Sequence, residues 1–432
     1  MNIWIFILNL SIVKISIANP SVAPHVKQNV TAYFDSGDLD TFYTTFFSHP
    51  ANKFSVLLSK IPGLKKELKK RSFDSIPIEY FASKPLLEIA RSISARKLSA
   101  KITDAVWHHA ELSFDKWVAK QIEAGTIDVV HTYEHCALAT LKKAKQKGIY
   151  TIYEQLSQHH AFFTKLANQQ LLLYPDLRTI DNDLLVNDKA KKRNVRRDNE
   201  LKLADVTLCN SSFTKKTLVD AGIDEGKITV IPLAFPKPIK KVRNRSKNEP
   251  VKFLYAGNQS LRKGIHLLYE AWKTCNFKTN EAELWLIGKM QLPEHLRMDL
   301  PGKVVIKNTI PHEELLALYS EADIFVLPTL ADGFGMVITE SMSQGTPVIT
   351  TENSAGPDII KHDESGWIIP AGDLNALVKQ MKTIVENAAA LDKFSTAALM
   401  SAHRWQWPDY RKLLSQKISS LYKMNLESFN AV

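Results

Sequence analysis

Short β-rich runs and amphipathic helical stretches alternate along this chain, and the alternation restricts the folds that it can adopt. Strands are predicted near residues 12–18, 41–47, 76–80, 127–131, 149–154, 205–209 and 228–231, and again at 251–255, 283–287, 304–306, 323–327, 347–350 and 367–369. Helical stretches such as 264–274, 311–320 and 373–385 separate them. This spacing produces parallel sheets covered by helices on both faces. The predicted fold class is therefore α/β.

The length of 432 residues is too great for one hydrophobic core, so two domains are expected. Residues 236–250 contain three prolines and six basic residues with almost no apolar pattern, which is typical of a solvated linker. We predict a doubly wound domain over 1–235, this linker, a second doubly wound domain over 251–405, and a terminal segment over 406–432. Such an arrangement implies a cleft, with ligands at the carboxyl ends of the strands.

The net charge of +11 is unevenly distributed. Residues 1–250 contain 38 basic and 25 acidic residues, whereas residues 251–432 contain 18 and 20. The two halves are therefore expected to face different partners. Three scattered cysteines, Cys136, Cys209 and Cys275, exclude a disulfide framework and a cysteine-rich zinc site, and they favour a reducing compartment.

The amino terminus allows two interpretations. The run from Ile3 to Val13 is largely apolar, but it is too short to span a bilayer and lacks a preceding basic region. The alternation from Ile12 to Ile17 favours a buried first strand, with a targeting segment as the alternative. We expect a cytoplasmic protein, with peripheral attachment to the inner face of the membrane as an option.

The segment from Ala322 to Thr350 contains the strongest functional pattern. A predicted strand ends at Pro328, the loop Asp332-Gly-Phe-Gly335 follows, and a helix opens near Met336. Glycines let the backbone approach a ligand, and the free N–H groups of a first helical turn attract phosphate. Glu340 lies eight residues after Asp332. The alternative is an ordinary turn followed by a solvated glutamate.

This segment resembles the donor site of retaining glycosyltransferases of family four with the GT-B fold, whose hallmark is two glutamates eight residues apart around a Gly-Phe-Gly core. Asp332 stands where the first glutamate usually lies, and Glu340 matches the second. The resemblance implies two Rossmann-like doubly wound domains facing a cleft, with a C-terminal helix that crosses back to the first domain. It implies a nucleotide-sugar donor and no metal cofactor.

The segment from Tyr255 to Gly264 resembles the family's strand–loop–helix that holds the donor diphosphate. Lys263 matches the usual lysine, Asn258 stands where an arginine is often found, and Arg262 is expected to supply that charge. With Asp332 and Glu340, these two cations form the expected catalytic set. The donor-binding residues that the resemblance implies are Gly257, Asn258, Gly288, Lys289, Ile310, Gly333, Phe334, Gly335, Met336 and Val337.

Four polar side chains of the amino-terminal half are candidates for the acceptor side. Asn19 and His25 belong to the first strand–helix loop, and His131 and His135 belong to a segment that resembles the family's cleft loop. For these histidines the alternative to contact with the sugar or acceptor is a structural role, and the sequence favours neither. His131 and His135 have the four-residue spacing of a zinc pair, but they follow a predicted strand and lack an evident third ligand, so no metal site is expected.

Residues 57–71 form a basic, amphipathic segment. It suits an anionic lipid surface, with a solvated helix face as the alternative. Nucleic acid is not expected to be a partner, because no recognition motif accompanies the charge.

The sequence thus predicts a retaining, metal-independent glycosyltransferase with a nucleotide-sugar donor and a carbohydrate or lipid-linked acceptor. Synthesis of polysaccharide, glycolipid or envelope glycan is the expected context. Asp332 is expected to hold sugar hydroxyls and Glu340 ribose hydroxyls. Two other functions stay open: a catalytically silent nucleotide-sugar-binding protein and a nucleotide-sugar epimerase.

Overall fold

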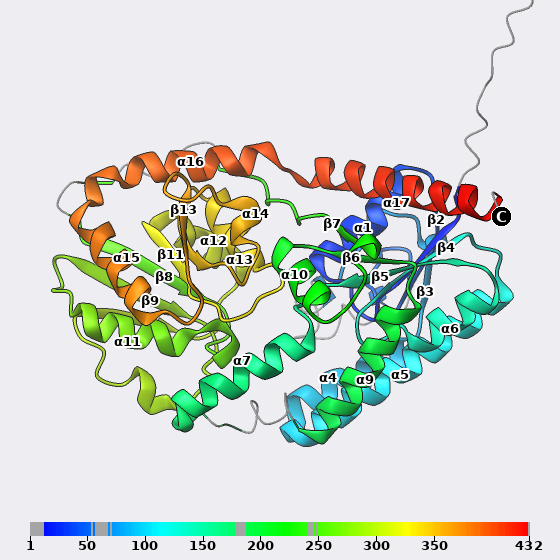
Figure 1. Ribbon diagram of the computed structural model, residues 1–432, viewed down its shortest axis with the longest axis horizontal. Coiled ribbons are helices and arrows are strands. Elements are labelled where there is room, and N and C mark those ends of the chain that lie inside the picture. Colours follow the sequence, from blue (N-terminus) through cyan, green and yellow to red (C-terminus); the bar gives the residue numbers. More distant parts are fainter. Residues whose placement is uncertain are drawn as a thin grey trace, which may run out of the picture. The chain divides into compact units, whose positions relative to one another are not determined.

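The computed structural model describes residues 13–52, 55–56, 68–69, 71–177, 179, 187–239, 245–246 and 249–430 (Figure 1). The first twelve residues, most of the basic segment 57–71 and part of the linker 236–250 lie outside these ranges. The predictions made for those stretches are therefore not addressed by the structure.

The first sheet has seven strands in the order β3-β2-β1-β4-β5-β6-β7. Their bounds are β1 Ile15–Ala18, β2 Leu39–Thr44, β3 Phe81–Ser83, β4 Val129–Tyr133, β5 Tyr150–Gln155, β6 Val206–Cys209 and β7 Ile228–Val230. The central strands pair in parallel, with Ile17 of β1 opposite His131 of β4. β1 and β4 are buried along their whole length, as expected for strands with helices on both faces.

One predicted strand is wrong. Residues 76–80 do not form a strand, because Ile78–Tyr80 form a 3-10 turn (η1) and β3 begins at Phe81. Pro77 precedes the turn and has no amide hydrogen for a sheet ladder, which explains why pairing starts after it.

The second sheet has six strands in the order β10-β9-β8-β11-β12-β13, all pairing in parallel. Their bounds are β8 Val251–Ala256, β9 Ala282–Ile287, β10 Lys303–Lys307, β11 Ile324–Leu327, β12 Val348–Thr351 and β13 Gly366–Ile369. Each lies within a residue or two of its predicted position. Phe253, Trp272 and Phe325 are fully buried in the core around this sheet.

Helices accompany both sheets (Figure 1). The α-helices are α1 Pro24–Asp35, α4 Pro85–Lys97, α5 Ala100–Ala124, α6 Leu138–Gln146, α7 His160–Leu173, α9 Asp188–Leu203, α10 Ser212–Asp220, α11 Ile265–Cys275, α12 His312–Glu321, α13 Met336–Ser343, α14 Gly356–Ile359, α15 Leu374–Glu386, α16 Leu391–Arg404 and α17 Trp407–Asn430. Further 3-10 turns are η2 Pro175–Leu177, η3 Glu225–Lys227, η4 Leu261–Lys263, η5 Glu294–Arg297 and η6 Ala388–Ala390. Within the described part of the chain, no helix combines the length and apolar character that a membrane crossing needs.

The internal contacts divide the chain into two compact units. The first comprises residues 1–154, 196–206 and 411–432, and the second comprises 155–195 and 207–410. The end of the chain returns to the first unit, where the Arg411 guanidinium pairs with Asp35 at 3.1 Å and donates to Gln28 at 2.8 Å. The fold is thus the expected pair of parallel-sheet α/β domains with a returning terminal helix. The domain boundaries given above divide residues 155–235 differently, and they stay a prediction.

Candidate functional site

The order of the second sheet brings two loops together. β8 and β11 are neighbours, so the loop after β8 and the loop after β11 leave the same edge of the sheet side by side. The chain turns from β8 to β9 on one side and reaches β11 only later, which makes this the point where the strand order reverses. Ligands of open parallel sheets bind at such a point.

Hydrogen bonds fix the two loops to each other. The carbonyl oxygen of Arg262 accepts from the amide of Leu330 at 2.9 Å and from the Thr329 hydroxyl at 3.0 Å. Gly264, which joins η4 to α11, has a positive φ of 66°, and a Cβ there would overlap the carbonyl oxygen of Pro328. Only glycine lets the basic loop approach the end of β11 this closely.

The Gly-Phe-Gly loop forms the start of α13, as predicted. Gly335 has a φ of 81° and precedes the first helical residue, Met336. The carbonyl oxygen of Gly333 accepts hydrogen bonds from the hydroxyls of Ser211 and Thr214. A Cβ on Gly333 would overlap the carbonyl oxygen of Leu156. The backbone of this loop is therefore held on several sides.

The amides that follow are available to a ligand. Among the described residues, none accepts a hydrogen bond from the backbone N–H groups of Phe334, Gly335, Met336 or Val337. These groups lie at the positive end of the α13 dipole, where an anion is stabilised. The loop can therefore bind a phosphate group.

Arg262 and Lys263 both form ion pairs with Asp332. The Arg262 Nη1 lies 3.1 Å from Asp332 Oδ1 and donates to the carbonyl oxygen of Ala331 at 3.0 Å, while Lys263 Nζ contacts Asp332 Oδ2. The Lys263 and Asp332 side chains are each 13% exposed, whereas that of Arg262 is 37% exposed. The sequence predicted that the two cations contact the diphosphate and the carboxylate contacts the sugar of one donor, and the structure pairs the three side chains with one another.

The pKa values follow from this burial and pairing. Burial alone would raise the pKa of Asp332, but the Lys263 ammonium and the Arg262 guanidinium outweigh it and lower the pKa to about 2. Burial lowers the pKa of Lys263, and the Asp332 carboxylate only partly offsets this. Asp332 is therefore an anion at neutral pH, beside two basic side chains.

Glu340 lies on α13 with a partner that the sequence did not single out. Its Oε1 is 3.2 Å from Nε2 of His312, the first residue of α12. The hydrogen bond with Glu340 raises the pKa of His312. Burial, together with the Glu340 charge, raises the pKa of Tyr319 well above its ordinary value. Glu340 is thus a largely buried carboxylate, and one of its oxygens is hydrogen-bonded to an imidazole.

The other predicted donor-binding residues lie around the same edge. Gly257 and Gly288 end β8 and β9 with φ values of 141° and 134°, and a Cβ on Gly288 would overlap the carbonyl oxygen of Gly257. The carbonyl oxygen of Asn258 accepts from the Tyr255 hydroxyl at 2.7 Å. Lys289 is exposed after β9, and Ile310 is half-buried just before α12.

His131, an acceptor-side candidate, lies inside β4 of the first unit rather than after the strand. It is fully buried, its Nδ1 lies 2.8 Å from the Tyr33 hydroxyl, and its Nε2 lies 2.9 Å from Glu154 Oε2. The Asn29 amide donates to the same Glu154 oxygen at 2.7 Å. His131 is therefore part of a polar network within the core of this unit.

The remaining acceptor-side candidates are also placed in the first unit. His25, in the first turn of α1, faces the Tyr133 ring at 6.2 Å, and burial lowers the pKa of His25. Asn19 Oδ1 accepts from the amide of Ser21 at 2.8 Å. His135 has a positive φ of 80°, and its amide donates to Glu200 at 3.2 Å. Their acceptor roles stay predictions.

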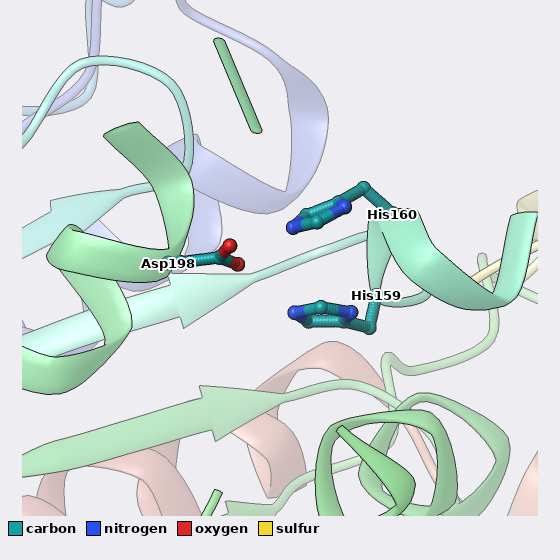
Figure 2. A group of neighbouring side chains, drawn as sticks. All are labelled: His159, His160 and Asp198. Atoms are coloured by element: carbon teal, nitrogen blue, oxygen red, sulfur yellow. The ribbon is translucent and has the colours of Figure 1, made fainter. Parts of the chain in front are cut away.

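Two further histidines lie at the start of α7. His159 Nδ1 accepts from the amide of Ala161 at 3.2 Å and caps the helix, and its ring centroid lies 4.2 Å from that of His160. Figure 2 shows both rings, together with Asp198 of α9. The capping bond gives His159 a structural role in the helix.

Sequence reasoning missed Ser211, Thr214 and His312 as site residues. A serine just before a helical stretch is an N-cap signal, and the Ser211 side chain accepts from the backbone N–H of Thr214 at the start of α10. Nothing in that signal indicates that the same hydroxyl bonds Gly333, because the contact joins residues more than a hundred positions apart.

Two family models match adjoining parts of the chain. "Glycosyltransferase Family 4" matches residues 64–235, and "Glycosyl transferases group 1" matches residues 236–399. Among curated proteins, the amylovoran biosynthesis glycosyltransferase AmsK of Erwinia amylovora is 29% identical over 179 residues, which is 39% of this chain and 44% of that protein. The chain thus matches less than half of the length of this relative.

Solved structures share the fold over nearly the whole chain. Sucrose-phosphate synthase of Thermosynechococcus elongatus matches with a TM-score of 0.59 and 18% identity, covering 95% of this chain and all of that one. HepE of Anabaena, solved in complex with UDP, matches with a TM-score of 0.58 and 14% identity, covering 94% of this chain and all of that one. The chain therefore belongs to the group 1 glycosyltransferases, as a GT-B protein of the family 4 type.

Proposed function

We propose that this protein transfers a sugar from a nucleotide-diphosphate sugar to an acceptor hydroxyl, with retention of configuration at the anomeric carbon. The observation that carries the proposal is the arrangement of Arg262 and Lys263 on a loop that is hydrogen-bonded to the loop leading into α13. Two basic side chains and a set of amides to which no described residue is hydrogen-bonded suit a diphosphate.

The donor diphosphate would lie over the amides of residues 334–337, with Arg262 and Lys263 at its sides. These groups are fixed before the reaction, and such preorganised donors usually supply the largest part of a rate enhancement. They would stabilise the negative charge that develops as the bond between the anomeric carbon and the phosphate oxygen breaks. In this proposal no metal is needed for the step, because Arg262, Lys263 and the dipole of α13 offset the charge once the diphosphate has displaced Asp332 as the partner of the two cations.

Group transfer then requires one new bond and one proton movement. The acceptor oxygen bonds to the anomeric carbon on the face from which the phosphate leaves, and its proton passes to the departing phosphate oxygen. Asp332 would hold sugar hydroxyls, and Glu340 would use the oxygen that His312 leaves available to hold ribose hydroxyls. The donor-contact roles of Asn258, Gly288, Lys289 and Ile310 belong to this same proposal.

The donor class has support from a structural neighbour, because HepE was solved with UDP. The relative from amylovoran biosynthesis supports a carbohydrate or lipid-linked acceptor in the synthesis of polysaccharide, glycolipid or envelope glycan. We propose a cytoplasmic enzyme that meets such an acceptor at the inner face of the membrane.

The test combines donor binding with product analysis. UDP-, GDP- and ADP-sugars are titrated calorimetrically against the purified protein in the presence of EDTA, and the donor that binds is incubated with candidate acceptors. The proposal expects binding without metal and an NMR spectrum of the product in which the donor's anomeric configuration is kept. An inverted product would contradict retention, and a changed sugar without acceptor would indicate an epimerase instead.

Replacing Lys263 with an uncharged residue tests whether the basic loop contacts the donor diphosphate. Lys263→Met should lower kcat/KM by at least about thirtyfold, because it removes a charge-assisted hydrogen bond of roughly 2 kcal/mol from the transition state. Lys273→Met on the exposed face of α11 is the matched control and should keep the wild-type value. Unchanged turnover in Lys263→Met would refute the role of Lys263.

A further inference from the structure

The surface formed by α4 and the start of α5 has its apolar residues on the outside. We call it the α4–α5 surface and define it by five aliphatic side chains that are all exposed: Leu86, Ile89, Ile93, Leu98 and Ile102. Leu86 is 75% exposed and Ile93 is 53% exposed. The two helices pack against each other within the first unit (Figure 1).

The amphipathicity of α4 is inverted relative to a helix that covers a protein core. Leu86, Ile89 and Ile93 have the spacing of one helix face, and that face is exposed. Glu88 and Ser94, by contrast, are buried. A helix with this pattern has an apolar face that the protein's own core does not use.

The buried glutamate is neutralised inside the unit. Glu88 pairs with the Arg71 guanidinium at 2.6 Å and with Arg91 at 3.5 Å, and it accepts from the Thr45 hydroxyl at 3.2 Å. The burial of Glu88 therefore removes a negative charge from this part of the surface.

The remaining charge of the segment is positive. Between Lys84 and Ile102 the sequence contains five lysines and arginines and a single acidic residue, Glu88. The α4–α5 surface thus combines exposed aliphatic side chains with a segment of positive net charge, in which Arg91 pairs with Glu88 and Lys101 is exposed. The next acidic residue, Asp104 on α5, is half-buried. Aliphatic insertion together with attraction to anionic headgroups is the combination by which peripheral proteins bind membranes.

An aromatic residue extends this surface onto α5. The Trp107 side chain is exposed, and the Arg91 guanidinium lies 4.4 Å from the centroid of its ring. Tryptophan and arginine both have an apolar body and a polar end, which suits the boundary between water and lipid.

We propose that the α4–α5 surface docks this protein on an anionic lipid bilayer, with the aliphatic side chains inserted between headgroups. Charge favours this occupant over a second copy of the chain, because two such surfaces face to face would bring like charges together. Nucleic acid would leave the aliphatic side chains without a partner. The inference does not depend on the transfer reaction, since vesicle binding can be measured without a donor or an acceptor.

Flotation of the full chain with vesicles tests the proposal. Vesicles of phosphatidylcholine are compared with vesicles that contain about 30% phosphatidylglycerol, at low and high salt. The wild type is expected to bind the anionic vesicles, and the double variant Leu86→Glu/Ile93→Glu should bind them at least about tenfold more weakly. Both side chains are exposed, so the variant should keep its folded circular dichroism spectrum.

The control variant introduces two glutamates at another exposed apolar site. Leu172 and Leu173 at the end of α7 in the second unit are 79% and 70% exposed, and Leu172→Glu/Leu173→Glu should bind vesicles like the wild type. Equal loss in both double variants would overturn the proposal, as would equal binding of neutral and anionic vesicles.

Two further measurements test the alternatives that the basic segment 57–71 binds the vesicles or that the α4–α5 surface binds a second copy of the chain. Neutralising Lys65, Lys66, Lys69 and Lys70 tests the basic segment 57–71. If that variant loses all vesicle binding while Leu86→Glu/Ile93→Glu keeps it, the α4–α5 surface is not the docking site. Light scattering that finds a wild-type dimer and a monomeric Leu86→Glu/Ile93→Glu variant would assign the surface to a second copy and also overturn the proposal.

Discussion

Lys263 and Asp332 form a largely buried ion pair across two loops of the second sheet. The Asp332 carboxylate thereby occupies the ammonium group that we assign to the donor diphosphate. An anionic ligand that enters this site must compete with Asp332 for Lys263, so the carboxylate acts as an internal counter-ion. This relationship leads to the first prediction.

Removing the counter-ion should strengthen the binding of nucleoside diphosphates. Asp332→Asn should bind UDP, or whichever nucleoside diphosphate the protein prefers, about tenfold more tightly, because the cations are no longer neutralised. The same variant should turn over more slowly, because Asp332 also holds the sugar in the proposed reaction. Calorimetric titration measures the first effect, with Asp392→Asn on the surface of α16 as the control. Weaker binding by Asp332→Asn would argue that the carboxylate organises the cations rather than competing for them.

Donor affinity should depend on the protonation of His312. Because the hydrogen bond to Glu340 raises the pKa of His312, the charged pair is fully present below the ordinary histidine pKa of about 6.5 and is lost as the pH rises through the raised value. We therefore expect the donor KM to increase with pH in this range. His312→Ala should raise KM about threefold at pH 6, leave kcat nearly unchanged and flatten the pH profile of KM.

A matched histidine separates this effect from general loss of charge. His295→Ala in the exposed turn η5 should keep the wild-type profile. If the donor KM of His312→Ala kept the pH dependence of the wild type, a group other than His312 would be responsible for that dependence.

Ser211 should act on catalysis through the peptide of Gly333. In a trans peptide the carbonyl and the following N–H point in opposite directions, so holding the Gly333 oxygen also orients the N–H of Phe334. Ser211→Ala should reduce kcat/KM about tenfold, which is less than the roughly hundredfold or greater loss on deleting a donor to developing charge, because the Phe334 N–H is kept and only its orientation is loosened. Ser211→Thr should restore most of the activity, because the hydroxyl is kept, and steady-state kinetics at a fixed acceptor concentration measures both.

Ser320→Ala provides the control for Ser211, since within the described ranges the Ser320 hydroxyl donates to the carbonyl oxygen of Ala317 in its own helix. A Ser211→Ala enzyme with wild-type kcat/KM but a lower melting temperature would reduce the residue to its role as the cap of α10.

Gly264 should be far less tolerant of a side chain than a glycine with a similar φ elsewhere. Gly264→Ala adds a Cβ that overlaps the Pro328 carbonyl oxygen, so we expect a loss of roughly 3 kcal/mol in the free energy of unfolding. Gly222 has a φ of 87° but open space around its Cβ position, so Gly222→Ala should lose only about 1 kcal/mol. Chemical denaturation of both variants checks the difference. Equal losses would mean that backbone strain, and not the close approach of the two loops, sets the cost.

Local patterns in the sequence were enough for much of the second sheet. The apolar runs located β8 to β13 within a residue or two, because most of these strands are buried and are marked by continuous apolar residues. The exposed edge strand β10 was located by the short run from Val304 to Ile306. The start of α13 after Gly335 was also predicted, from the glycine-containing loop that separates a strand from a helical stretch. The strand predicted at 76–80 is wrong, because Pro77 lacks the amide hydrogen that a sheet ladder needs and the apolar run around it forms the turn η1 instead.

What the sequence determined by itself was the type and order of the elements and the chemical character of the loop before α13, because these depend on residues close together in the chain. The partners of the site residues were decided only by the tertiary structure. Asp332 lies some seventy residues from Arg262 and Lys263, and Gly333 lies more than a hundred from Ser211. The Asp332 contacts arise because strand order brings the loops after β8 and β11 to one edge of the second sheet, whereas Ser211 follows β6 of the first sheet. No local periodicity carries the information for either contact.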